Sequence, residues 1–157
     1  MFWDRWLIKK KFTYGGRNDN GSVVPNGKIQ FCKYINGNVV LISKNIFDKL
    51  GNLSPKYTHS IGDYDYGLRA FRNKINCVIT KKYIATCPKN KMPDFCNPEV
   101  SLINRFKSFY SIKGLNYSEY IIFRKKFWGK KWVYFSFTAF IRTLFPRIYN
   151  ILNRTYE

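Results

Sequence analysis

The chain has 157 residues, enough for one domain with a hydrophobic core of its own. Hydrophobic residues make up 45% of it and aromatic residues 19%, which excludes a disordered polycation. A net charge of +19 predicts an anionic partner: nucleic acid, an acidic lipid surface or a phosphorylated substrate.

The first fifty residues predict loops, short strands and one helix. Dense turn chemistry between residues 13 and 26 predicts a loop, in which Asn18-Asp-Asn-Gly21 is a turn rather than part of a calcium-binding loop. Residues 28–34 alternate as a half-exposed strand does, Asn36-Gly37-Asn38 predicts a turn, and the run Val39-Val-Leu-Ile42 is typical of a buried strand. A short helix over 44–50 follows, capped by Ser43 and closed by Gly51.

The rest of the chain predicts strands and then helices. A helix begins near Asp63, and residues 75–80 and 83–86 form short strands. Residues 100–110 and 117–128 show helical patterns, the second with Asn116 or Ser118 as its cap.

The four cysteines, Cys32, Cys77, Cys87 and Cys96, contain no Cys-x-x-Cys pair, and the chain has a single histidine. A structural zinc site is therefore not expected, and the scattered cysteines indicate a reducing compartment.

Asp63 and Asp65 lie at the start of the predicted helix, in a chain with only nine acidic residues. Asp is a favoured N-cap, and acidic residues in the first turn interact favourably with the helix dipole, so a capping role explains both. Alternatively, one carboxylate faces a cleft and removes a proton from a substrate as a general base. The two residues alone leave both interpretations open.

An ordered set of motifs surrounds these aspartates. Tyr14-Gly-Gly-Arg17 is followed by Ile35-Asn-Gly-Asn-Val-Val-Leu-Ile42, Phe47, Leu50-Gly-Asn-Leu53, and His59 before Gly62-Asp-Tyr-Asp-Tyr-Gly-Leu-Arg69. In order and spacing the set resembles the acceptor half of bacterial family 2 glycosyltransferases, over about residues 14–87 and more loosely to the C-terminus.

The resemblance implies an α/β fold. Residues 1–99 would form a partial GT-A-like half, with a short mixed sheet and flanking helices, and residues 100–157 a C-terminal extension of amphipathic, basic-aromatic helices. The implied reaction is an inverting transfer of a sugar from a nucleotide-sugar donor to a glycan or lipid-linked acceptor in surface polysaccharide synthesis. The implied location is the cytoplasm, peripheral to the inner face of the cell membrane.

The resemblance also assigns roles. Asp63 aligns with the catalytic base of the family's Glu-Asp pair, whose glutamate is replaced here by Gly62. Asp65 falls on a later acidic position with a structural, helix-capping role, and residues 13–26 would form a flexible lid beside the sugar-nucleotide pocket. The candidate substrate-binding residues are Gly15, Gly16, Arg17, Asn36, Gly37, Asn38, His59, Asp65 and Arg69.

The family's nucleotide-binding half, with its first βαβ units and a metal-binding Asp-x-Asp, would precede Tyr14. One βαβ unit takes about 30 residues, so the residues before Tyr14 do not provide it. Asp63-Tyr-Asp65 matches the base motif in position, not the metal motif. We therefore expect a C-terminal fragment, inactive alone, whose full-length enzyme binds Mg²⁺ or Mn²⁺ through ligands absent from this chain.

Two non-catalytic functions remain as alternatives. A basic, aromatic chain can bind nucleic acid, although basic residues spread through every segment and no nucleic-acid motif argue against it. The other is a membrane-surface module, because residues 125–154 interleave basic and aromatic side chains as helices in the plane of an anionic bilayer do. A C-terminal helix that simply covers the sheet explains the same segment.

Overall fold

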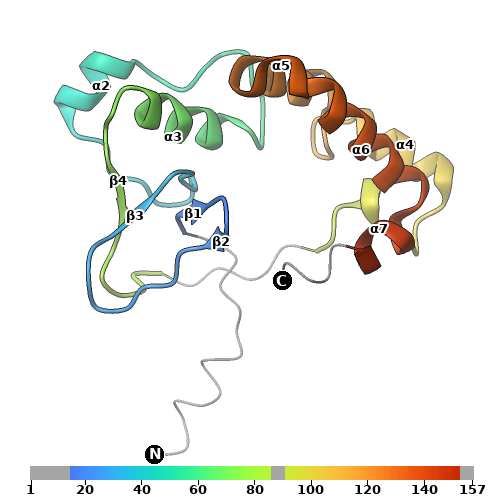
Figure 1. Ribbon diagram of the computed structural model, residues 1–157, viewed down its shortest axis with the longest axis horizontal. Helices are drawn as coiled ribbons and strands as arrows, with labels where there is room; N and C mark the ends of the chain where they lie inside the picture. The colour runs from blue at the N-terminus through green and yellow to red at the C-terminus, as the bar shows by residue number, and fades with distance from the viewer. Residues whose placement is uncertain (1–14, 86–90, 153–157) are drawn as a thin grey trace, which may run out of the picture. The chain divides into compact units, whose positions relative to one another are not determined.

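The computed structural model describes residues 15–85 and 91–152, which form a mixed α/β structure, about 48% helical, with two small antiparallel sheets (Figure 1). They belong to two units whose sequences interleave. The first unit comprises the residues up to Asn52 together with Tyr66–Lys91, and the second comprises Leu53–Asp65 together with the residues from Met92 onward. This differs from a sequential division after residue 99, which stays a prediction.

The strands of the first unit form two separate two-stranded antiparallel sheets. They are β1 (Arg17–Asn18), β2 (Gly21–Ser22), β3 (Gln30–Cys32) and β4 (Cys77–Ile79), with β1 paired to β2 and β3 to β4. The turn predicted at Asn18-Asp-Asn-Gly21 is confirmed as the connection between β1 and β2. Gly21 has a φ of +120°, a conformation that is open to glycine because it has no Cβ.

The predicted sheet is wrong in two respects. Every strand pair in the described residues is antiparallel, so the mixed sheet is not formed there. The run 39–42, expected to be a buried strand, is irregular and exposed, with Leu41 98% exposed, and residues 83–85 are irregular too. An apolar β-branched run favours a strand only where another strand satisfies its backbone, and no described segment pairs with this run.

Two helices flank these strands. The helix α2 (Lys44–Leu50) has the predicted bounds, and the backbone N–H of Gly51 closes it on Phe47 O at 2.7 Å. The helix α3 (Gly62–Arg72) confirms the helix expected after Asp63. Its last part belongs to the first unit, where Gly67 packs against the backbone of residues 33–35.

The second unit is helical. It contains the 3₁₀ turns η1 (Asp94–Cys96) and η2 (Gly129–Lys131) and the helices α4 (Leu102–Tyr110), α5 (Tyr117–Trp128), α6 (Trp132–Leu144) and α7 (Pro146–Leu152). The helices predicted over 100–110 and 117–128 are thus confirmed. No helix in residues 15–85 and 91–152 is long and apolar enough to cross a membrane.

Aromatic rings hold this unit together. Phe109 of α4 is fully buried, and its ring centroid lies 4.7 Å from that of Tyr117 of α5 and 4.8 Å from that of Phe140 of α6. Phe95, Cys96 and Ala139 complete the buried cluster. Rings that meet at these distances add about 0.5–1.5 kcal/mol beyond the area they bury, so this cluster joins three helices that sequence periodicity alone leaves separate.

Candidate functional site

Asp63 and Asp65 stand in the first turn of α3 but have different surroundings. The helix begins at Gly62, so both residues lie inside it and neither is its N-cap. Asp63 is partly exposed, and its Oδ1 accepts a hydrogen bond from the backbone N–H of Tyr64 at 2.7 Å. Asp65 is fully buried, and its Oδ1 lies 2.5 Å from Lys126 Nζ of α5.

The structural, helix-capping role expected for Asp65 stays a prediction. Its buried carboxylate pairs with Lys126 of another helix, whose side chain is 36% exposed. Burying a carboxylate costs free energy unless a counter-charge compensates it. Asp65 consequently joins α3 to α5, and Asp63 is the carboxylate of the pair that solvent reaches.

The segment before α3 is held on α5 by a second polar contact. The Thr58 backbone N–H and hydroxyl donate to the two carboxylate oxygens of Glu119, at 3.0 and 2.7 Å. Asn116 is the N-cap residue of α5, one of the two caps expected, and its side chain makes no capping hydrogen bond but donates to Thr58 Oγ1 at 3.4 Å. His59 follows Thr58 directly and is exposed. The loop that carries His59 to Asp63 is thus positioned by α5.

The glycine-arginine turn lies in the first unit. Gly15 is exposed and has a φ of +139°, whereas Gly16 is buried, and an added Cβ there would lie 2.6 Å from Cys32 Sγ. The backbone N–H of Arg17 donates to Tyr34 O at 2.9 Å. Residues 17–22 are consequently a hairpin hydrogen-bonded to residues 33 and 34, and the flexible lid expected over residues 13–26 stays a prediction.

Charges reinforce that hairpin. Lys33 Nζ lies 2.8 Å from Asp19 Oδ2, and Tyr34 donates its hydroxyl to Asp19 Oδ1 at 2.9 Å. The hydrogen bond from Lys33, followed by that from Tyr34, lowers the pKa of Asp19 below its ordinary value. The same hydrogen bond raises the pKa of Lys33.

The predicted Asn36-Gly37-Asn38 turn is confirmed. The Asn36 side-chain oxygen accepts a hydrogen bond from the Asn38 backbone N–H at 3.1 Å, the geometry by which asparagine stabilises a turn. Gly37 and Asn38 are exposed.

Arg69 contacts protein carbonyls. Its guanidinium donates to the backbone oxygens of Leu50 and Asn52, the latter at 2.8 Å, and lies 4.6 Å from the centre of the Tyr66 ring. The planar guanidinium suits such a double contact. Arg69 therefore fixes the end of α2 to α3 within the first unit.

The candidate residues fall into two groups, one in each unit. Asp63, Asp65 and His59 belong to the second unit, and the remaining candidates belong to the first. Sequence reasoning missed Lys126 and Glu119, which organise the second group. Glu119 carried a usable signal, because acidic residues are scarce in this chain; Lys126 was one of 28 basic residues and carried none.

The described residues show no metal-binding cluster, and one hollow that they form does not include the candidate residues. They contain no group of three or more His, Cys, Asp and Glu side chains able to hold a metal ion. Lys126 pairs with Asp65, the second carboxylate of Asp63-Tyr-Asp65. One hollow, about 630 Å³, lies in the second unit and is lined by residues between 92 and 113. It includes none of the candidate residues.

Comparisons of the chain with protein-family models, with curated proteins and with solved structures return no match.

Proposed function

We propose that the chain is the acceptor-side part of an inverting glycosyltransferase, which moves a sugar from a nucleotide-sugar donor to a glycan or lipid-linked acceptor in surface polysaccharide synthesis. The ordered motifs from Tyr14 to Arg69 support this function. Such an enzyme would work in the cytoplasm at the inner face of the membrane, where nucleotide-sugars and lipid-linked acceptors meet.

The proposal depends most on the contrast between the two aspartates of α3. A general base must come within hydrogen-bonding distance of the hydroxyl that it deprotonates. Asp63 is partly exposed and meets this requirement, whereas Asp65 is buried against Lys126 and does not. Asp63 is therefore the proposed base, and Asp65 orients the helix that carries it.

In the proposed step the acceptor hydroxyl oxygen bonds to the anomeric carbon of the donor sugar while its proton passes to the Asp63 carboxylate. The bond from that carbon to the diphosphate oxygen breaks on the opposite side, and the electron pair leaves with the diphosphate. This accounts for inversion. Gly62, which stands in place of the family's glutamate, contributes no carboxylate to the step.

The other candidates take supporting roles. Arg69 acts as a positioning residue, because its guanidinium already contacts the Leu50 and Asn52 carbonyls. His59 is exposed on the loop before α3 and is the candidate for acceptor contact. No step is assigned to Mg²⁺ or Mn²⁺, whose ligands the resemblance implies in the nucleotide-binding part of the full-length enzyme.

The test compares Asp63→Asn with Asp65→Asn in the chain joined to the nucleotide-binding part that the resemblance implies. Asp63→Asn should lower kcat by about 10²–10⁴-fold and leave donor affinity nearly unchanged. Asp65→Asn should lower the melting temperature first, with activity falling only as the fold loosens. Equal losses at both positions, each tracking stability, would refute a catalytic role for Asp63.

A further inference from the structure

The helix α6 buries three small side chains and packs Phe140 against the core, whereas several of its large apolar side chains are exposed. Ser136, Ala139 and Thr143, spaced as one stripe of a helix, are buried. Thr143 donates its hydroxyl to Ala139 O at 3.0 Å, and the hydroxyls of Ser136 and Tyr117 of α5 are hydrogen-bonded. Short side chains thus bring α6 close to the rest of its unit.

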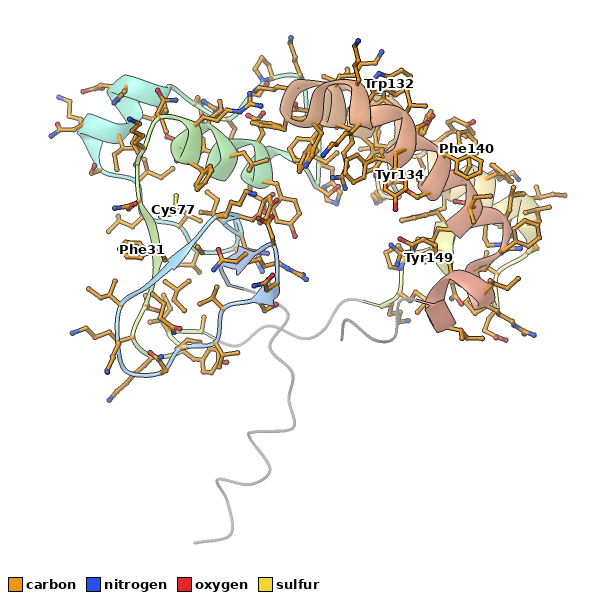
Figure 2. All side chains as sticks on the ribbon, viewed as in Figure 1. Phe31, Cys77, Trp132, Tyr134, Phe140 and Tyr149 are labelled. Carbon is orange, nitrogen blue, oxygen red and sulfur yellow. The ribbon has the colours of Figure 1, made fainter. Side chains whose placement is uncertain are left out.

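Another stripe of α6 carries exposed apolar side chains. Its exposed members are Val133 (57% exposed), Tyr134 (66%), Phe137 (64%) and Leu144 (37%), which we call the outer face of α6. Figure 2 shows Tyr134 on this helix, together with Trp132 and Phe140. Soluble proteins rarely expose contiguous apolar surface of this kind without an occupant. Phe140 of α6 packs against the buried cluster of its unit, so the large apolar side chains of this helix divide between the core and the exposed outer face.

Positive charge accompanies this face. Residues 100–152 contain ten lysines and arginines and one acidic residue, Glu119, which already contacts Thr58. Lys130 and Lys131, both exposed, directly precede α6. Arg147 near the start of α7 is 75% exposed and meets Glu99 only at 3.6 Å. An occupant of the outer face must accordingly be apolar on its inside and anionic at its surface.

We propose that the outer face of α6 inserts into the headgroup region of an anionic lipid bilayer, with Lys130 and Lys131 beside lipid phosphates or carboxylates. An amphipathic helix with basic flanks binds such an interface in its plane. Thirteen residues are too few to cross it, since crossing takes about 20. Nucleic acid would satisfy the charge but would leave Val133 and Leu144 without an apolar partner. This inference concerns binding alone and does not rest on the proposed transferase activity.

The first measurement is flotation of the whole chain with vesicles. Vesicles of phosphatidylcholine containing about 30% phosphatidylserine should bind the chain, and vesicles of phosphatidylcholine alone should bind it much more weakly. Raising the salt concentration well above about 0.15 M should weaken binding of the chain to the vesicles that contain phosphatidylserine. Equal binding to both vesicles would overturn the proposal.

The second measurement changes the face and its charges separately. Phe137→Asp should lower binding to anionic vesicles by at least about tenfold, because a carboxylate is costly at apolar depth. Leu41→Asp is the matched control: it makes the same charge change at an exposed apolar residue of the first unit and should leave binding unchanged. Lys130→Gln with Lys131→Gln should cost roughly fivefold for each charge removed.

Further measurements on the wild-type chain and on Phe137→Asp distinguish a lipid bilayer from a second copy of the chain or a nucleic acid as the partner of the outer face. On addition of anionic vesicles, amide hydrogen exchange should slow within 130–151 more than elsewhere in the chain. If Phe137→Asp leaves vesicle binding intact, or if the wild-type chain forms a stable dimer that Phe137→Asp dissociates, the face serves something other than lipid and the proposal fails. Salt-sensitive binding of a single-stranded oligonucleotide in place of anionic vesicles would likewise overturn it.

Discussion

Gly67 is the residue whose replacement tests most directly how α3 is seated. In a helix interior, Gly→Ala normally stabilises by about 1 kcal/mol. Here an added Cβ would lie 2.9 Å from Lys33 O and 3.0 Å from Ile35 N. These are backbone atoms of a segment that is itself hydrogen-bonded to Arg17, through Lys33 and Tyr34. They cannot yield as a flexible side chain would.

Overpacking of this kind costs about 1–3 kcal/mol. With two backbone atoms in the way we expect the upper half of that range, so Gly67→Ala should destabilise by about 1–2 kcal/mol after the helix-propensity gain is subtracted. For a chain of this size that lowers the melting temperature by about 2–4 °C per kcal/mol.

The control is Gly62→Ala in the same helix. Its added Cβ would meet only Leu53 Cδ2, at 4.0 Å, so stability should stay the same or rise. Thermal unfolding followed by circular dichroism gives the overall effect, and amide exchange in β3 reports on the unit concerned. If Gly67→Ala proves as stable as Gly62→Ala, the close packing of α3 on residues 33–35 is wrong.

Three more predictions follow from the contacts of charged and thiol groups. Lys126→Met removes the ammonium beside the buried Asp65 carboxylate and should destabilise by about 1–3 kcal/mol in urea unfolding, because a buried acceptor loses a partner whose own side chain is 36% exposed. Lys130→Met, on an exposed lysine before α6, should cost almost nothing; a similar small loss for both would contradict the pairing of Lys126 with Asp65. The hydrogen bond with Lys33 is the largest cause that lowers the pKa of Asp19 in the folded protein. Ionised Asp19 therefore contributes to the free energy of unfolding at pH values above its ordinary pKa of 3.8, and this contribution is lost as the pH falls through the lower folded pKa. Asp19 is largely exposed, so the contribution is at most about 1 kcal/mol, and Asp19→Asn should remove this acid-sensitive part of the unfolding curve. Burial, with the nearby Cys77 thiol, raises the pKa of Cys32 from 9.0 to about 11. Iodoacetamide at pH 8 should therefore modify Cys32 in the folded protein about 100-fold more slowly than an ordinary thiol, because it reacts with the thiolate. Rapid labelling of the folded protein would show that Cys32 is not buried.

The candidate site was only partly predictable. The helix after Asp63 was predictable, because aspartates near its start and arginines near its end act over a few residues. The difference between Asp63 and Asp65 was not, since it comes from Lys126, 61 residues further along the chain. The contact of Thr58 with Glu119 spans the same separation. Without the fold, only the resemblance to the glycosyltransferase family distinguished the two aspartates, and their own chemistry did not.

The sequence by itself determined the local elements: the bounds of α2 and α5, the turn at Asn18-Asp-Asn-Gly21, and the Asn36 turn. Their causes are short-range, because turn residues and helix periodicity act within a few positions. Only the tertiary structure decided that 39–42 stays exposed, that Gly67 lies against a neighbouring backbone, and that α6 packs Phe140 against the core but leaves Phe137 exposed. Those outcomes depend on which distant segments contact each other. A pattern of hydrophobic residues indicates how many apolar side chains can be buried, but it does not identify the segments against which they pack.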